Sequence, residues 1–140
     1  MVGKYLFYRQ NALSGPARRR AVVSFGDSRV DPALLDQGWS SLRGCEKRVC
    51  RSVLGRARIF APLDVAEDLD LEVRARGEGE ILLEVNGRGV ARLPLKGDLS
   101  TFRVLVPRAY WHRELNEVAF SGASSCDVNE VAFTREAAAR

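Results

Sequence analysis

The chain has few of the residue types on which metal centres and nucleophilic active sites depend. Its 140 residues include three cysteines and a single histidine, His112. The spacing of Cys45, Cys50 and Cys126 matches no recognised zinc motif. An odd number of cysteines favours reduced structural thiols over a disulfide framework, but one bridge stays open, with Cys45 and Cys50 as the nearest pair. No Gly-x-Ser-x-Gly elbow is present. We therefore expect no metal, no cofactor and no enzymatic activity.

Long apolar runs are also absent. None approaches the roughly 20 residues that a membrane-spanning helix needs. The N-terminal segment Met-Val-Gly-Lys-Tyr-Leu-Phe-Tyr-Arg-Gln has only a short apolar patch with a charge inside it, which makes a poor signal peptide. We expect a cytoplasmic protein, at most peripheral to a membrane, or else a processed or excised piece of a larger protein.

Lysine is scarce and the basic charge is unevenly distributed. Only three of the 22 basic residues are lysines, which indicates coding bias in a GC-rich genome. Residues 1–60 contain 12 basic and 4 acidic residues, a net charge of +8, whereas residues 61–140 contain 10 and 14, a net charge of −4. A basic first part is compatible with an anionic neighbour, but solvated faces of an Arg-rich protein are the preferred explanation, because charges on strands normally face water. Nucleic acid is disfavoured, because the basic run 18–20 lacks interleaved aromatics.

What the chain does contain is strand periodicity. In residues 69–76, apolar Leu69, Leu71, Val73 and Ala75 alternate with charged residues, and residues 101–106 repeat this pattern. Such alternation predicts strands with one buried face. Asn86-Gly87 lies between two apolar runs and predicts a tight hairpin turn.

Further strands are expected on both sides of this centre. The predicted strands are 21–25, 58–63, 69–76, 80–86, 89–95, 101–106, 116–120 and 129–133. Pro62 should either make the second of these an edge strand or mark the end of that strand, and residues 31–36 could form one helical turn. Short strands at this spacing predict an all-β, antiparallel jelly-roll β-sandwich of about eight strands with minor helix. We expect an N-terminal arm or edge strand over 1–20, the sandwich over 21–134 and a frayed tail over 135–140.

The pentapeptide Asn-Glu-Val-Ala-Phe occurs twice, at 116–120 and at 129–133. In each copy the Val and the Phe are two residues apart and share one strand face. The two strands should therefore have the same inward and outward register, although so short a repeat does not predict a solenoid.

Three of these segments together resemble a known family. Leu-Glu-Val-Asn-Gly-Arg-Gly-Val-Ala-Arg-Leu-Pro-Leu, Thr-Phe-Arg-Val-Leu-Val-Pro and Leu-Asn-Glu-Val-Ala-Phe are similar to segments of galactose-binding-like jelly rolls, which accompany bacterial glycosidases, sulfatase-like proteins and other surface proteins. The resemblance covers about residues 38–133. It implies a non-catalytic module that binds sugar or packs against a partner. The calcium site of many members has no clear counterpart here, although Asp64, Glu67 and Asp68 are acidic and close in sequence.

Two groups of residues are candidates for binding. Sugars stack on exposed aromatic faces, with polar side chains beside the ring to bind the hydroxyls. The candidate sugar ligands are Tyr110, Trp111, His112, Arg113 and Trp39. A core position is the competing interpretation for both tryptophans. The candidate docking residues, in the basic and aromatic N-terminal stretch, are Tyr5, Phe7, Tyr8, Arg18, Arg19 and Arg20.

Two functions follow from these candidates. The first is a non-catalytic accessory subunit that docks through its N-terminal stretch on a larger protein assembly, either membrane-associated or not. The alternative is a carbohydrate-binding module that uses the loop 108–113 and Trp39. The sequence slightly favours the subunit, because the N-terminal stretch lies outside the recognisable domain.

Overall fold

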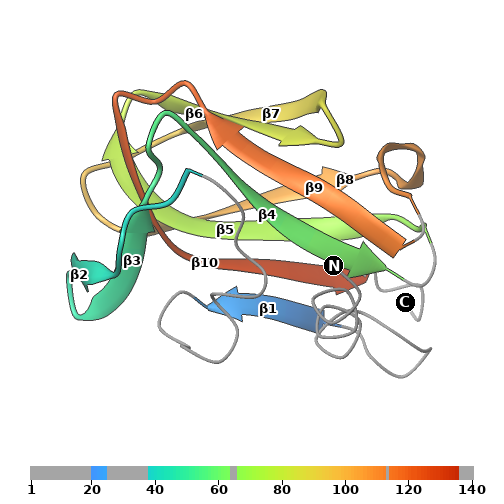
Figure 1. Cartoon of the computed structure of the whole chain (residues 1–140), viewed down its shortest axis with the longest axis horizontal. Coiled ribbons are helices and arrows are strands. Elements are labelled where there is room, and N and C mark those ends of the chain that lie inside the picture. The colour runs from blue at the N-terminus through green and yellow to red at the C-terminus, as the bar shows by residue number, and fades with distance from the viewer. Residues whose placement is uncertain (1–19, 25–37, 64–65, 113, 136–140) are drawn as a thin grey trace.

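The computed structural model describes residues 20–24, 38–63, 66–112 and 114–135 (Figure 1). Its elements are β1 (Arg20–Ser24), β2 (Arg43–Cys45), β3 (Arg48–Ser52), β4 (Arg56–Leu63), β5 (Leu69–Glu78), β6 (Glu80–Val85), β7 (Arg88–Pro94), β8 (Ser100–Val106), the 3-10 helix η1 (Arg108–Tyr110), β9 (Glu114–Ser121) and β10 (Ser125–Arg135). The expected helical turn at 31–36 lies outside the described residues.

Two antiparallel sheets face each other. One has the order β2-β3-β10-β5-β8, with β1 added beside β10, and the other has the order β4-β9-β6-β7. In Figure 1 the four-stranded sheet forms the upper layer, and β5, β10 and β1 lie beneath it. The all-β sandwich expected from the strand spacing is confirmed. Pro62 lies in β4, an edge strand of its sheet as expected, since β4 pairs only with β9 among the described strands.

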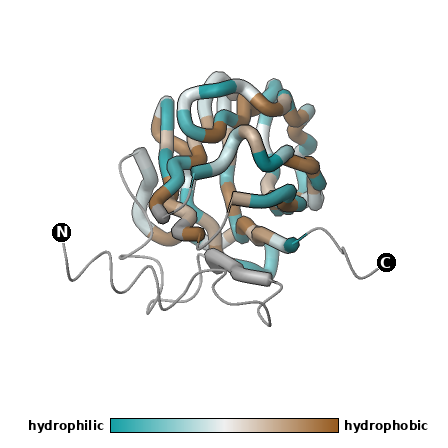
Figure 2. Tube along the Cα trace, turned by 90° about the vertical axis from the view of Figure 1, so that its right-hand side faces the viewer, coloured by the Kyte–Doolittle hydropathy of each residue, from teal (hydrophilic) through white to brown (hydrophobic). Residues whose placement is uncertain are grey.

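The alternating residues of the central strands form the core. Leu69, Leu71, Val73 and Ala75 are fully buried, whereas the charged residues between them are half-buried on the outer face. Buried and half-buried positions also alternate along β6 and over residues 57–61 of β4, and apolar and polar positions are interspersed along the trace in Figure 2. Burial of these side chains contributes about 1.5–3 kcal/mol for each large aliphatic residue. The period-2 pattern therefore determines which face of each strand turns inward.

The two copies of Asn-Glu-Val-Ala-Phe lie in different sheets, in β9 and β10. Val118 and Phe120 point into the core from the four-stranded sheet, and Val131 and Phe133 do so from the other sheet. The shared register is confirmed, and the repeat supplies both halves of one core.

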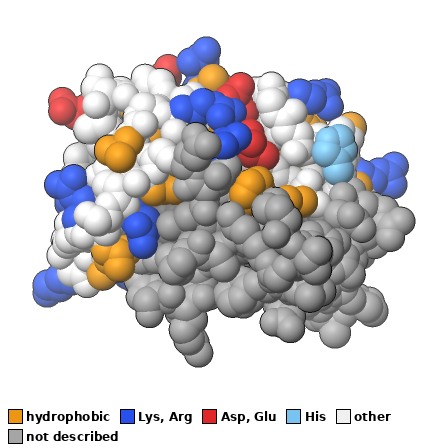
Figure 3. Space-filling view, viewed as in Figure 1, with side chains coloured by type: hydrophobic (Ala, Val, Ile, Leu, Met, Phe, Trp, Pro, Cys, Tyr) orange, Lys and Arg blue, Asp and Glu red, His pale blue; other side chains and the backbone are white. Residues whose placement is uncertain are grey.

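The outer face of the four-stranded sheet is covered by ion pairs. Glu117 on β9 binds Arg58 at 2.8 Å and Arg56 at 3.4 Å, and Arg56 also lies 3.8 Å from Glu84 on β6. Figure 3 shows acidic and basic side chains side by side over these strands. Glu84 and Glu117 on this face are therefore already paired with arginines of the same sheet.

The segment between residues 42 and 56 differs most from expectation. It forms the hairpin β2–β3, which the weak sequence pattern did not predict, and its strands pair Arg43 with Cys50 and Cys45 with Arg48. This pairing places the Cα atoms of Cys45 and Cys50 5.6 Å apart, and the two form a disulfide. The expectation of reduced thiols is therefore wrong for this pair. Cys126 is a free, buried cysteine.

The structure tests only part of the domain boundaries expected from the sequence. The strand predicted at 21–25 is β1 (Arg20–Ser24), which pairs with β10 from Glu130 to Thr134. Residues 1–19 and 136–140 lie outside the described residues, so the arm and the frayed tail stay predictions. Among the described residues, no helix has the length and apolar character needed to cross a membrane.

The cysteine arrangement predicts distinct thiol counts. Denatured protein should show one reactive thiol per chain without reductant and three after reduction, measured with a chromogenic disulfide reagent. In the native state the thiol of Cys126 should react very slowly at pH 8. Burial raises the pKa of Cys126 to about 12, helped by the charge of Asp127, and the thiolate is the reactive form. Three thiols in the unreduced, denatured protein would contradict the Cys45–Cys50 bridge.

Candidate functional site

One end of the sandwich is built from two loops and the start of a strand. The turn between β6 and β7 contains Asn86 and Gly87, whose φ angles of 52° and 82° suit the tight turn that Asn-Gly predicts. The Asn86 side chain donates to the backbone oxygen of Tyr110 at 2.9 Å and accepts from the backbone N–H of Glu117 at 3.0 Å. The turn, the η1 loop and β9 are therefore held together by one side chain.

Asn116, on β9, joins this network from inside the protein. Its amide nitrogen donates to the backbone oxygens of Ala61 at 3.0 Å and His112 at 2.9 Å. Its amide oxygen accepts from the backbone N–H of His112 at 2.7 Å and from the Asn86 amide at 2.8 Å. All four hydrogen-bonding positions of the buried amide are filled. We define Asn86 and Asn116 as the asparagine pair that fixes this end of the sandwich.

Arg88 and Tyr110 form the exposed part of this end. The Arg88 guanidinium lies over the Tyr110 ring, 4.2 Å from its centroid, and donates to the backbone oxygen of Ala109 at 3.1 Å. A cation over an aromatic face is attracted by the ring quadrupole. These two contacts hold the guanidinium at the surface with other N–H groups left to bind a ligand.

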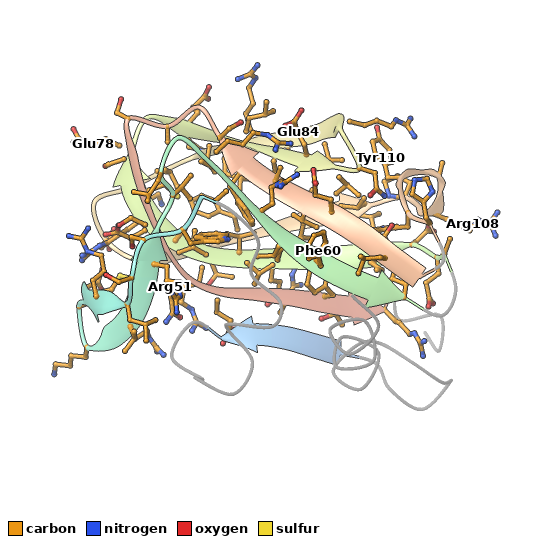
Figure 4. All side chains as sticks on the ribbon, viewed as in Figure 1. Arg51, Phe60, Glu78, Glu84, Arg108 and Tyr110 are labelled. Carbon is orange, nitrogen blue, oxygen red and sulfur yellow. A yellow bond between two sulfur atoms is a disulfide. The ribbon has the colours of Figure 1, made fainter. Side chains whose placement is uncertain are left out.

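Arg108 and His112 flank Tyr110 in the same loop, and both are exposed. Figure 4 shows Arg108 and Tyr110 at the end of the sandwich opposite Glu78 and the β2–β3 hairpin. The one described carboxylate in contact with the loop belongs to Asp68, which accepts from the backbone N–H of Arg108 at 2.7 Å. We call Arg88, Arg108, Tyr110 and His112 the arginine–tyrosine platform.

Trp111 does not belong to this platform. It is 4% exposed, its ring lies edge-on to Phe133 with centroids 6.2 Å apart, and its indole N–H donates to Val106 O at 3.2 Å. A sugar can stack only on an accessible ring face. Trp111 is therefore a core residue, and its assignment as a sugar ligand is corrected.

Trp39 lies elsewhere. Its indole N–H donates to Arg58 O at 2.8 Å, and its half-buried ring is edge-on to Phe120, with centroids 5.6 Å apart. Gly38, at φ 97°, permits this approach, because a Cβ there would overlap the Arg56 backbone. Phe120 and Asn116 occupy opposite ends of β9, so the structure does not bring Trp39 to Tyr110 and His112.

Several sequence candidates fall outside the described residues. They are Arg113, Asp64, and the docking residues Tyr5, Phe7, Tyr8, Arg18 and Arg19. Arg20 opens β1, but its side chain is not described. Of the acidic trio considered for calcium, Glu67 binds Arg135 at 2.9 Å. No cluster of three or more His, Cys, Asp or Glu residues that could hold a metal ion occurs in the described part of the chain.

Sequence reasoning missed the roles of Arg88 and Asn116 at this end. Arg88 received no role in the sequence analysis, and nothing in the sequence places it on Tyr110. Asn116 belongs to the Leu-Asn-Glu-Val segment of the family resemblance, and Asn86 belongs to its Val-Asn-Gly segment. The signal that could have found Asn116 is an asparagine at a strand position where an apolar residue is expected.

No protein-family model matches the sequence, and no curated protein does either. Solved structures do match the fold. A CBM36-1 domain of a multidomain xylanase from the hindgut metagenome of Trinervitermes trinervoides has a TM-score of 0.61 at 7% identity, covering 84% of this chain and 98% of that one. A family 35 carbohydrate-binding module from Clostridium thermocellum has a TM-score of 0.59 at 9% identity, covering 84% and 98%.

A multidomain enzyme also contains this fold. The GH26-CBM35 β-(1,4)-mannanase of Podospora anserina matches with a TM-score of 0.56 at 13% identity, covering 85% of this chain but 28% of that one. At these identities the likeness establishes the fold. The chain has the jelly-roll β-sandwich of carbohydrate-binding modules, as the resemblance to galactose-binding-like domains implies.

The hydrogen bonds of Asn116 predict that the two copies of Asn-Glu-Val-Ala-Phe lose different amounts of stability when the asparagine of each copy is removed. Asn116→Ala should lower the free energy of unfolding by about 3 kcal/mol, because it leaves several buried polar groups without partners. Asn129→Ala is the matched control from the second copy. Asn129 makes two hydrogen bonds, to Val49 O at 2.8 Å and from Arg74 at 3.2 Å, so we expect a loss of about 1 kcal/mol. Denaturant unfolding of both variants tests this, and equal losses would contradict it.

The burial of Trp111 predicts a stability defect. Trp111→Ala should destabilise the protein by about 3–5 kcal/mol through loss of core packing. Trp111→Phe should lose much less, since it retains an aromatic ring in the same space. Thermal unfolding measures both. If the Ala variant kept the wild-type melting temperature, Trp111 would have to be a surface residue.

Proposed function

We propose that this chain is a non-catalytic carbohydrate-binding module that accompanies a larger protein. The arginine–tyrosine platform carries the proposal. It is an exposed polar surface with a half-buried aromatic ring, fixed from beneath by the asparagine pair. Pre-organised groups lose little conformational freedom on binding, which favours affinity. Since one fold hosts many functions, the jelly roll supports the proposal without deciding it.

The ring and the polar groups would have separate roles. The guanidinium of Arg88 would donate hydrogen bonds to sugar oxygens, while Tyr110 holds that guanidinium in place. His112 and Arg108 would reach adjacent hydroxyl groups. This differs from simple stacking on an aromatic face, because Arg88 already covers one face of Tyr110.

The absence of catalysis is part of the proposal and has a chemical basis at the one free thiol. With a pKa of about 12, Cys126 is protonated near neutral pH. A cysteine nucleophile requires the thiolate, usually with a nearby base. The only histidine, His112, lies in the loop that precedes β9, whereas Cys126 is at the start of β10.

The larger protein is proposed on the precedent of the matched mannanase, in which this fold is one part of a longer chain. Docking through the N-terminal stretch is a separate matter. It concerns residues outside the described ranges, and it stays a prediction from sequence.

A pair of Tyr110 variants tests the platform. The wild-type chain should be retarded in native gels that contain a binding polysaccharide, screened over neutral and charged polysaccharides. Tyr110→Leu should weaken binding by about threefold or more, since the ring stabilises the Arg88 guanidinium by about 0.5–1 kcal/mol and fixes its position. Tyr110→Phe retains the ring and should bind like the wild type.

One outcome would overturn the module function, and another would overturn only the assignment of the site to the platform. If no polysaccharide in the panel retards the wild type, the module function fails. If a polysaccharide retards the wild type and Tyr110→Leu equally, glycan binding stands but the site lies elsewhere. Thermal unfolding of both variants ensures that any loss of binding is measured on folded protein.

A further inference from the structure

The charges around the arginine–tyrosine platform are unbalanced. Arg88 and Arg108 form no ion pair with any carboxylate among the described residues. Three acidic residues near this end already have partners: Glu84 on β6 and Glu117 on β9 are paired with Arg56 and Arg58, and Glu67, before β5, is paired with Arg135. Asp68 is the exception, and its carboxylate accepts from the backbone N–H of Arg108. Figure 3 shows basic side chains at the η1 end, while the acidic ones visible on that face lie elsewhere.

The platform also has an excess of hydrogen-bond donors. A guanidinium has five N–H donors and no acceptor. The hydroxyl groups of a neutral sugar are best satisfied by donors and acceptors together. A carboxylate or a sulfate group presents acceptors alone, and a guanidinium binds either with two parallel hydrogen bonds.

The guanidinium of Arg88 is held ready for such a contact. Its one described hydrogen bond uses Nη1, and its face lies on the Tyr110 ring. A charge held in a fixed orientation loses less side-chain entropy on binding than a free arginine does. Arg92, four residues further along β7, is also exposed but has no such contact in the described structure, which makes it the natural comparison.

We infer that the platform recognises anionic glycans, with Arg88 binding the carboxylate or sulfate group of an acidic sugar unit. This inference rests on the proposed carbohydrate-binding function and specifies the class of sugar. Arg108 and His112 would contact the same or the adjacent unit. Neutral polysaccharides such as xylan or mannan would bind weakly by comparison.

The test compares polysaccharides matched for everything but charge. Polygalacturonate and its methyl ester form one pair, for the carboxylate, and dextran sulfate and dextran form the other, for the sulfate. Binding is measured by affinity gel electrophoresis at constant ionic strength. Poly-glutamate controls for attraction to any polyanion. We expect retardation by at least one charged member, about tenfold weaker binding to its neutral partner, and no retardation by poly-glutamate.

Arginine variants then locate the contact. Arg88→Gln should weaken binding to the acidic polysaccharide by about tenfold, as expected for loss of a charge-assisted hydrogen bond. Arg88→Lys should recover only part of it, because an ammonium cannot form the paired hydrogen bonds. Arg92→Gln makes the same change of charge on the same strand and should bind like the wild type.

Each contrary result has a separate meaning. Equal binding to charged and neutral partners overturns the inference but keeps the carbohydrate-binding function. Equal losses in Arg88→Gln and Arg92→Gln, or retardation by poly-glutamate, reduce the interaction to diffuse charge attraction and also overturn it. If no polysaccharide binds, both proposals fail.

Discussion

The end of the sandwich depends on the buried amide of Asn116. A buried amide without partners would cost several kcal/mol, and here each of its four positions is filled. Its partners come from β4, from the turn after β6 and from the loop before β9. One side chain therefore fixes three segments that are distant in the sequence. Because these bonds are directional, they also determine the path of the loop that presents Tyr110, which apolar packing alone would leave less well defined.

The exposed platform follows from this buried network. Asn86 is held by Asn116 and by the backbone of β9, so the turn that carries Arg88 has a defined position relative to Tyr110. The cation–π contact is weak by itself, about 0.5–1 kcal/mol at an exposed site. It becomes useful for binding because the groups that form it are held by bonds inside the protein. The buried hydrogen bonds therefore position the exposed site. In the same loop, Trp111 packs into the core while its neighbours Tyr110 and His112 lie toward the surface.

The fold supports only the general class of the proposed function, and the ligand has to be inferred from the site. Jelly rolls of similar shape occur in carbohydrate-binding modules at identities near 10%, where a shared fold is secure but a shared ligand is not. The class of ligand must come from chemistry at the surface. The proposed preference for an anionic sugar rests on two described arginines, Arg88 and Arg108, that have no carboxylate partner in the described residues, while Glu84 and Glu117 on strands of the same sheet as Arg88 are already paired.

Local periodicity in the sequence determined the strands, the buried faces of β5, β9 and β10, and the Asn86-Gly87 turn, because these depend on residues close together in the chain. The hairpin β2–β3 was missed, since its Arg-rich strands lack alternation and are stabilised by pairing with β10 and by the Cys45–Cys50 bridge. Only the tertiary structure decided that Trp111 is buried, that Trp39 lies at the other end of β9, and that Arg88 meets Tyr110. Such contacts join distant segments, and their geometry is set by how the two sheets pack rather than by any local pattern.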